Sequence, residues 1–247
     1  MEAIILAGGK AERLGEAAGG MPKALVEIAG RPLAAYQIRL LAGAGVSRII
    51  VSCAQGQADL FEDALGDLGV PLTCAAEPEP LGRGGGLKFA AEVRSDEGPV
   101  IALNGDELLD IDLAALLEHH RAHQPAATVT LAPLESGFGV VDLGEDDYIS
   151  GFREAPRLPY WVNCGVYVLE QEAIVRLPQR GDHEQSTWPQ LAAENRLLGY
   201  KHEGLWLTVN TPKDLRRAEE YLNANPDWLE TGTSSQTFAR PSPRSHS

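Results

Sequence analysis

The sequence has little cysteine, little positive charge and no long apolar run, and each shortage excludes a class of protein. The three cysteines, Cys53, Cys74 and Cys164, are far apart and form no CxxC pair, so we expect reduced thiols rather than a disulfide framework. No stretch approaches the roughly 18 apolar residues of a membrane span. The acidic Glu2 and the short first apolar run do not resemble a signal peptide. We therefore expect a cytoplasmic protein that does not associate with membranes.

The charge balance is strongly acidic. Thirty-five Asp and Glu residues face 21 Lys and Arg residues, which gives a net charge of −14. A chain of this sign does not bind nucleic acid through its whole surface, because the phosphate backbone would be repelled. If the protein binds phosphates, a local cluster of basic residues must hold them.

Strand-like and helix-like segments alternate through the first half of the chain. Such alternation is typical of right-handed βαβ units and a mainly parallel sheet. The pattern predicts strands over 3–6, 49–53, 72–75 and 100–103, and helices over 32–44, 58–65, 86–93 and 113–120.

The pattern changes after residue 124. It predicts strands over 128–132, 139–143, 148–152, 161–169, 198–201 and 206–209, a hairpin turn at 144–147, and helices over 188–194 and 212–222. The fold class expected is therefore α/β, a Rossmann-like three-layer sandwich with a mainly parallel central sheet and an antiparallel elaboration in the second half. We expect one domain over 1–225, followed by a disordered tail over 226–247, which is rich in Ser and Pro.

A glycine turn follows the first predicted strand, in the stretch IILAGGKAERLG of residues 4–15. It has neither the G-x-G-x-x-G spacing of a dinucleotide site nor the G-K-[ST] ending of a P-loop. Arg13 lies just beyond the turn, and Lys23 lies ten residues further on. Two cations beside free backbone N–H groups would form a cradle for a polyphosphate. The plainer interpretation is a turn that only reverses the chain.

A second polar element follows the strand predicted at 100–103, where the chain reads Asn104-Gly105-Asp106. A carboxylate at the carboxyl end of a parallel strand lies at the edge where α/β sheets bind ligands. Together with phosphate oxygens it would suit Mg²⁺. The alternative is a turn aspartate that caps the next helix.

Seven short segments occur in the order found in one known family. The sequence resembles the sugar-1-phosphate nucleotidylyltransferases, most closely the mannose- or manno-heptose-1-phosphate guanylyltransferases and the glucose-1-phosphate thymidylyltransferases. The segments are LAGG…RL…PK over 6–23, LGRGGG over 81–86, LNGD over 103–106, FGVV over 138–141, FREAP over 152–156, NCGVY over 163–167 and WLTVNTP over 206–212.

This resemblance implies a reaction, a cofactor and a set of site residues. The reaction would join an NTP to a sugar 1-phosphate, releasing pyrophosphate by Mg²⁺-assisted in-line attack on the α-phosphorus. Residues 1–124 would bind the NTP, and residues 125–225 would bind the sugar phosphate. The implied residues are Arg13, Lys23 and Asp106 for catalysis, Leu6, Gly8, Gly9, Gly85 and Gly105 for the nucleotide, Gly139, Glu154 and Asn163 for the sugar phosphate, and Asp106 and Asn210 for Mg²⁺.

The sequence departs from the family pattern at several positions. Ala155 stands where the family has a lysine, so that Arg153 or Arg157 would have to supply the cation. Thr208 stands at the usual metal-binding aspartate, and Asn210 matches the asparagine that N-acetylglucosamine-1-phosphate uridylyltransferases use instead. These departures leave two alternatives, a non-sugar acceptor such as phosphocholine or a polyol phosphate, and a non-catalytic regulatory relative. The base, the sugar and a homo-oligomeric state stay open.

Overall fold

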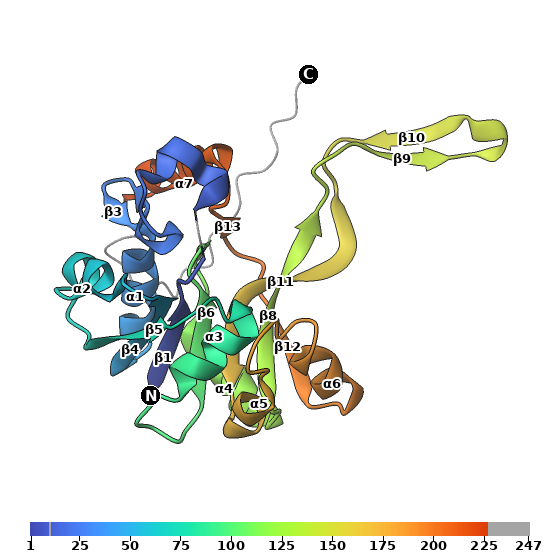
Figure 1. Cartoon of the computed structure of the whole chain (residues 1–247). Coiled ribbons are helices and arrows are strands. Elements are labelled where there is room, and N and C mark those ends of the chain that lie inside the picture. Colours follow the sequence, from blue (N-terminus) through green and yellow to red (C-terminus); the bar gives the residue numbers. More distant parts are fainter. Residues whose placement is uncertain (10, 227–247) are drawn as a thin grey trace.

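A seven-stranded sheet forms the centre of the molecule in the computed structural model, which describes residues 1–9 and 11–226 (Figure 1). The predicted tail lies outside the described residues, apart from its first residue. The strand order is β12-β8-β11-β6-β1-β4-β5. The strands are β1 (Glu2–Leu6), β4 (Arg48–Ala54), β5 (Leu72–Glu77), β6 (Val100–Asn104), β8 (Ala127–Glu135), β11 (Arg157–Leu169) and β12 (Leu197–Lys201).

Most neighbouring strands of this sheet run parallel. β1 pairs in parallel with both β4 and β6, β4 pairs with β5, and β12 pairs with β8. β11 alone runs antiparallel to its two neighbours, β6 and β8. The predicted fold class, a Rossmann-like parallel sheet with an antiparallel part in the second half, is confirmed.

Helices cover both faces of the sheet because the strands alternate apolar side chains between the faces. Ile5 of β1 joins a buried cluster with α1, α2 and α4, whereas its neighbour Ile4 joins a cluster with α3, α5 and α6. Each fully buried side chain of this size stabilises the fold by roughly 1.5–3 kcal/mol. The helices are α1 (Leu33–Gly43), α2 (Ala58–Leu65), α3 (Gly82–Ala91), α4 (Leu113–His123), α5 (Gln171–Arg176) and α6 (Thr187–Ala193).

A third apolar cluster lies beyond the carboxyl ends of the central strands. Here α7 (Pro212–Ala224) packs through Leu222 on Leu14 of the 3₁₀ helix η1 (Glu12–Ala18). The short strands β7 (Glu107–Leu109) and β13 (Trp206–Thr208) pair antiparallel beneath it. This cluster brings the last helix against the segment that follows the glycine turn.

A two-stranded arm projects from the body (Figure 1). It consists of β9 (Val140–Leu143) and β10 (Ile149–Arg153), joined through the short 3₁₀ helix η3 (Glu145–Asp147). The predicted hairpin and its turn are therefore present.

Some elements differ from the sequence-based expectation. α3 begins at Gly82 rather than at residue 86. The loop that contains Gly181 packs on the glycines of the first turn, and the Gly84 amide donates to the Gly181 carbonyl at 2.9 Å. The short elements β7, α5, β2 (Glu27–Ile28) and β3 (Arg31–Pro32) were not predicted. Among the described residues no helix combines the length and the apolar character needed to cross a bilayer.

Candidate active site

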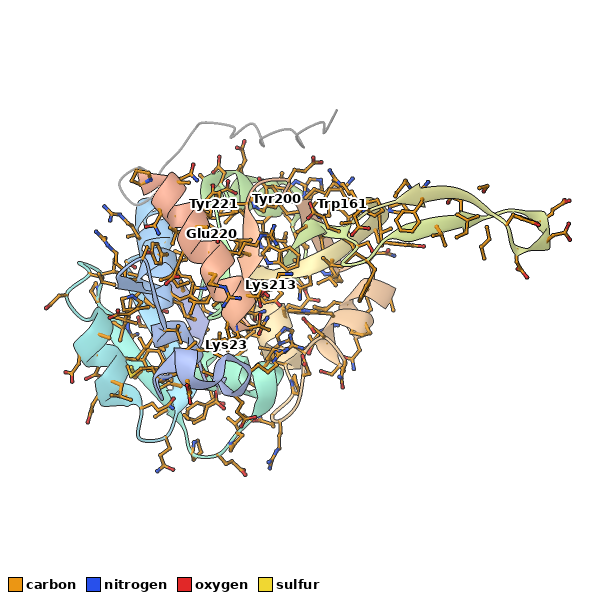
Figure 2. All side chains as sticks on the ribbon, turned by 90° about the horizontal axis from the view of Figure 1, so that it is seen from above. Lys23, Trp161, Tyr200, Lys213, Glu220 and Tyr221 are labelled. Carbon is orange, nitrogen blue, oxygen red and sulfur yellow. The ribbon has the colours of Figure 1, made fainter. Side chains whose placement is uncertain are left out.

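Four of the predicted residues are joined by hydrogen bonds of two cationic side chains. The Nζ atom of Lys23 donates to Asp106 Oδ2 at 3.0 Å and to Asn210 Oδ1 at 2.7 Å. Arg13 Nη2 donates to the same Asn210 oxygen at 3.1 Å. The Lys23 side chain is 12% exposed and that of Asp106 is 27% exposed. The group is thus held by the protein on one side and open to a ligand on the other. Figure 2 shows Lys23 beside α7 in the view from above.

Local structure explains why Asp106 lies at this edge of the sheet. The Gly105 amide donates to the carbonyl of Leu6, the last residue of β1, at 2.8 Å. A Cβ atom on Gly105 would stand only 2.6 Å from that carbonyl oxygen, so only glycine permits the approach. Asp106 in turn accepts the Val209 amide through its backbone carbonyl at 2.8 Å, which aligns the segment carrying Asn210.

The first turn of α7 fixes the Asn210 backbone. Thr211 and Asp214 form a capping box, in which the Asp214 carboxylate accepts the Thr211 amide at 2.8 Å. The same carboxylate accepts the Asn210 amide at 3.2 Å. The Asn210 side-chain amide donates to Thr208 Oγ1 at 2.7 Å, which turns its carbonyl oxygen toward Lys23 and Arg13. Thr208 therefore orients the Asn210 side chain.

The charge balance of this cluster favours an anionic ligand. Lys23 and Arg13 bring two cations to Asp106. The next carboxyl group, Glu107, is buried, accepts the Trp206 indole N–H at 2.8 Å, and has its pKa raised to about 8, first by burial and then by Asp106. With Glu107 protonated at neutral pH, two positive charges face one negative charge. The surplus suits a polyphosphate.

The glycine turn lies at the same edge of the sheet. Gly8 and Gly9 are exposed after the end of β1. A Cβ atom on Gly8 would lie 3.2 Å from an oxygen of Glu77, the last residue of β5. The Glu77 carboxylate accepts the Ser52 hydroxyl at 2.7 Å and the Leu81 amide at 3.1 Å. Glu77 was not predicted as a site residue, because the strand predicted at 72–75 ends two residues before it and β5 runs on to Glu77.

Gly85 packs against the loop that contains Gly181. Its amide donates to the Gly181 carbonyl at 3.3 Å, and a Cβ atom would stand 2.6 Å from the Gln179 carbonyl oxygen. Gly85 is buried under this loop and does not present its backbone to an open site. The structure therefore gives Gly85 a packing role, and its nucleotide contact stays a prediction.

Asn163 belongs to a second polar cluster. Its side-chain amide donates to Glu184 at 2.6 Å and to the Tyr167 hydroxyl at 2.8 Å. Glu184 and Asp182 both accept hydrogen bonds from Arg83, the residue in place of the family's threonine. These two carboxylates outnumber the single positive charge of Arg83. Neither carboxylate was predicted, because no motif contains the 182–184 segment.

Gly139 and Glu154 lie at the base of the arm. A Cβ atom on Gly139 would lie 3.1 Å from a Glu154 oxygen, so the two are neighbours. Arg13, Lys23, Asp106 and Asn210 are called the Lys23 cluster below. Among the described residues no hydrogen bond connects Gly139 or Glu154 to this cluster. Arg153 pairs with Asp142 at 2.6 Å and Arg157 lies 3.5 Å from a Glu203 oxygen. Both arginines face carboxylates here, and which cation stands in for the lysine absent at Ala155 stays a prediction.

A family model described as nucleotidyl transferase matches residues 2–225. The chain belongs to the nucleotidyl transferase family. It is 32% identical to mannose-1-phosphate guanyltransferase 2 of Candida glabrata over 249 residues, which cover 94% of this chain and 69% of that protein. It is 33% identical to mannose-1-phosphate guanylyltransferase of Mycobacterium tuberculosis over 234 residues, which cover 90% of this chain and 64% of that protein.

Solved structures show the same fold as this nucleotidyltransferase. HddC from Yersinia pseudotuberculosis has a TM-score of 0.70 at 23% identity, with 90% of this chain and 99% of that chain covered. A complex of the same protein with GMP-PN has a TM-score of 0.68, with the same identity and coverage. The predicted family and the predicted enzyme class are thus confirmed.

Proposed function

We propose that this enzyme transfers GMP from GTP to mannose 1-phosphate or a closely related sugar 1-phosphate, releasing pyrophosphate. The general reaction, which makes an NDP-sugar from an NTP and a sugar 1-phosphate, is the one expected from the sequence. Guanine and mannose are favoured by the names of the relatives, which are mannose-1-phosphate guanyltransferases over 87–94% of this chain. Neither of the two alternatives has such support.

The observation that carries the proposal is a hydrogen-bonded group of four side chains, in which Lys23 donates to Asp106 and Asn210 and Arg13 donates to the same Asn210 oxygen. Arg13 is the more exposed cation and binds the β- and γ-phosphates, which leave as pyrophosphate. Lys23 lies deeper and binds the α-phosphate that is attacked. Both cations stabilise the charge that develops on the leaving oxygens.

The donor set at Lys23 also fits a magnesium ion. One carboxylate oxygen of Asp106 and one carboxamide oxygen of Asn210 both point at the same cation. Hard oxygen donors of this kind, together with phosphate oxygens and waters, are what Mg²⁺ prefers. When bound, the metal would neutralise phosphate charge and polarise the α-phosphate. Asp106 and Asn210 would be its protein ligands.

No side chain needs to remove a proton from the nucleophile. The attacking group is a phosphate monoester, whose second pKa is about 6, so it is already an anion near neutral pH. The task of the protein is to bring two anions together and hold them in line. Two cations and an oxygen donor pair are sufficient for that task.

Glu77 offers a physical reason for guanine. Its carboxylate lies near the glycine turn, and within the described part of the chain it accepts side-chain or backbone hydrogen bonds from Ser52 and Leu81 alone, which leaves further acceptor positions. Guanine presents two adjacent donors, N1–H and the 2-amino group. Uracil and thymine present one donor on the corresponding edge, so a carboxylate here favours GTP.

The test is a panel of GTP, ATP, UTP, CTP and dTTP against mannose, glucose and heptose 1-phosphates, with pyrophosphate release as the readout. We expect the highest kcat/KM for GTP with mannose 1-phosphate. A preference for UTP or dTTP would contradict the base assignment. If none of the sugar 1-phosphates led to pyrophosphate release with any of the five nucleotides, the proposed reaction would be contradicted.

A further inference from the structure

The Asp106 carboxylate is carried by a tight turn, Gly105-Asp106, that joins β6 to β7. The backbone carbonyl groups on either side of this turn both accept hydrogen bonds from one side chain, the amide of Gln37 in α1. Its Nε2 atom lies 2.8 Å from the Asn104 oxygen and 2.8 Å from the Glu107 oxygen. A single polar group therefore spans the turn that carries the proposed metal ligand.

The chemistry of the two partners fixes how the Gln37 amide is oriented. Both partners are carbonyl oxygens, which only accept hydrogen bonds, so the NH₂ group faces them and uses one hydrogen for each. The side chain is 3% exposed, so water does not compete for these hydrogen bonds. With both carbonyls held, the turn cannot rotate without breaking a buried hydrogen bond.

The helix that carries Gln37 also supports the other side of the site. α1 packs on the 3₁₀ helix η2 (Lys23–Leu25), whose last two residues belong to the same buried apolar cluster as α1. Lys23 begins η2, and its ammonium group donates to Asp106 at 3.0 Å. Both members of this ion pair are thus held against one helix, Lys23 through apolar packing and Asp106 through Gln37.

We propose that Gln37 is a positioning residue for nucleotidyl transfer. Through the two carbonyl groups it fixes the direction of the Asp106 carboxylate at the edge of the sheet where Lys23 and Asn210 lie. Gln37 acts only through this turn. The inference rests on the proposed function, in which Asp106 and Asn210 are the protein ligands of Mg²⁺.

Stability gives a weaker reason for a glutamine at this position. Among the described residues the Gln37 Oε1 atom has no hydrogen-bond partner, although it is buried. A buried acceptor without a donor is costly, and this cost offsets part of what the two hydrogen bonds of the NH₂ group contribute. We therefore expect the loss of the amide to disturb the turn and its carboxylate more than the fold as a whole.

Binding of an unreactive GTP analogue, with an α,β-methylene bridge, tests the proposal without depending on turnover. Titration calorimetry on the full chain gives its dissociation constant in Mg²⁺ and in EDTA, and the ratio of the EDTA value to the Mg²⁺ value measures the contribution of the metal. Gln37→Leu removes both N–H donors at similar side-chain volume. We expect it to lower this ratio about tenfold, the usual effect of losing a group that supports a metal ligand. The constant in EDTA should change by less than about threefold.

The matched control lies at the preceding position of α1. The Tyr36 hydroxyl donates to the Ile28 carbonyl at 2.6 Å and is also buried. Tyr36→Phe therefore removes a similar hydrogen bond from the same helix, but one that holds β2 rather than the Asp106 turn. Both variants should lower the melting temperature by roughly 2–4 °C, and only Gln37→Leu should lower the ratio. Gln37→Glu, which keeps the shape but has no NH₂ group, should lower it at least about threefold.

An unchanged ratio in both Gln37 variants would overturn the proposal. An equal fall in Tyr36→Phe would also overturn it, because the effect would then come from a general loosening of α1. A Gln37→Leu chain that does not fold under conditions where Tyr36→Phe folds would assign Gln37 to the fold and overturn the proposal as well. A parent that binds the analogue no better in Mg²⁺ than in EDTA, or not at all, would contradict the proposed function itself, so the two failures are distinguishable.

Discussion

Replacing Lys23 with methionine removes the cation at the centre of the site while keeping its apolar stem. The Nζ atom makes two charge-assisted hydrogen bonds, to Asp106 at 3.0 Å and to Asn210 at 2.7 Å. If this ammonium binds the α-phosphate in the transition state, its loss costs roughly 3–4 kcal/mol of activation free energy. We therefore expect kcat to fall by about 10²–10³-fold.

The same change should affect stability much less. Asp106 loses its partner but is 27% exposed, so water can solvate the carboxylate. The free energy of unfolding should fall by only about 1–2 kcal/mol. Lys88→Met is the matched control, because Lys88 Nζ donates to the Leu177 carbonyl at 2.6 Å and has a structural role. It should cost comparable stability and leave kcat within about threefold of the parent.

The assay is pyrophosphate release at saturating GTP and mannose 1-phosphate, with urea unfolding measured on the same preparations. The two variants should separate, one losing turnover and the other only stability. If Lys23→Met kept kcat within tenfold of the parent but lost 3 kcal/mol of stability or more, Lys23 would be a structural lysine. The reasoning about the phosphate site would then be refuted.

Three further changes test neighbouring groups. The pKa of Glu107 is raised from 4.5 to about 8 in the folded protein, so the unfolded chain loses this proton first as pH rises. The free energy of unfolding of the metal-free protein therefore falls by up to roughly 4–5 kcal/mol between these two pH values. Glu107→Gln, which keeps an acceptor for Trp206, should flatten that slope in urea unfolding. Glu77→Gln should lower the preference for GTP over ATP in kcat/KM roughly tenfold, whereas Glu79→Gln, at an exposed ion-paired carboxylate, should not. Asn210→Ala should raise the Mg²⁺ concentration for half-maximal rate about tenfold. An unchanged slope, preference or Mg²⁺ requirement would contradict the respective assignment.

Sequence reasoning located the Lys23 cluster because its residues sit at positions that a parallel sheet brings together. Asp106 follows β6, and Arg13 follows the glycine turn after β1. Because β1 and β6 are parallel neighbours, the strand order alone places both residues at one edge of the sheet. Asn210 is distant in sequence. Its place could be predicted only from the family pattern, since it depends on how α7 packs on η1.

Other parts of the site depend on contacts that no local pattern encodes. The partners of Arg83 come from a loop about a hundred residues away, and that loop also explains the packing role of Gly85. The exposure of Leu143 and Phe152 on the arm was likewise not predicted. The alternation at 140–143 and 149–153 indicates a buried face, but only the three-dimensional arrangement shows that the same chain does not cover it.

The central claim is that Asp106 and the cations around it carry out nucleotidyl transfer. The most direct measurement is pyrophosphate release from GTP, mannose 1-phosphate and Mg²⁺ by the parent and by Asp106→Ala, with folding checked by circular dichroism. We predict steady release by the parent and a loss of at least about a thousandfold in a folded variant. Release by the variant at the parent's rate would contradict the account.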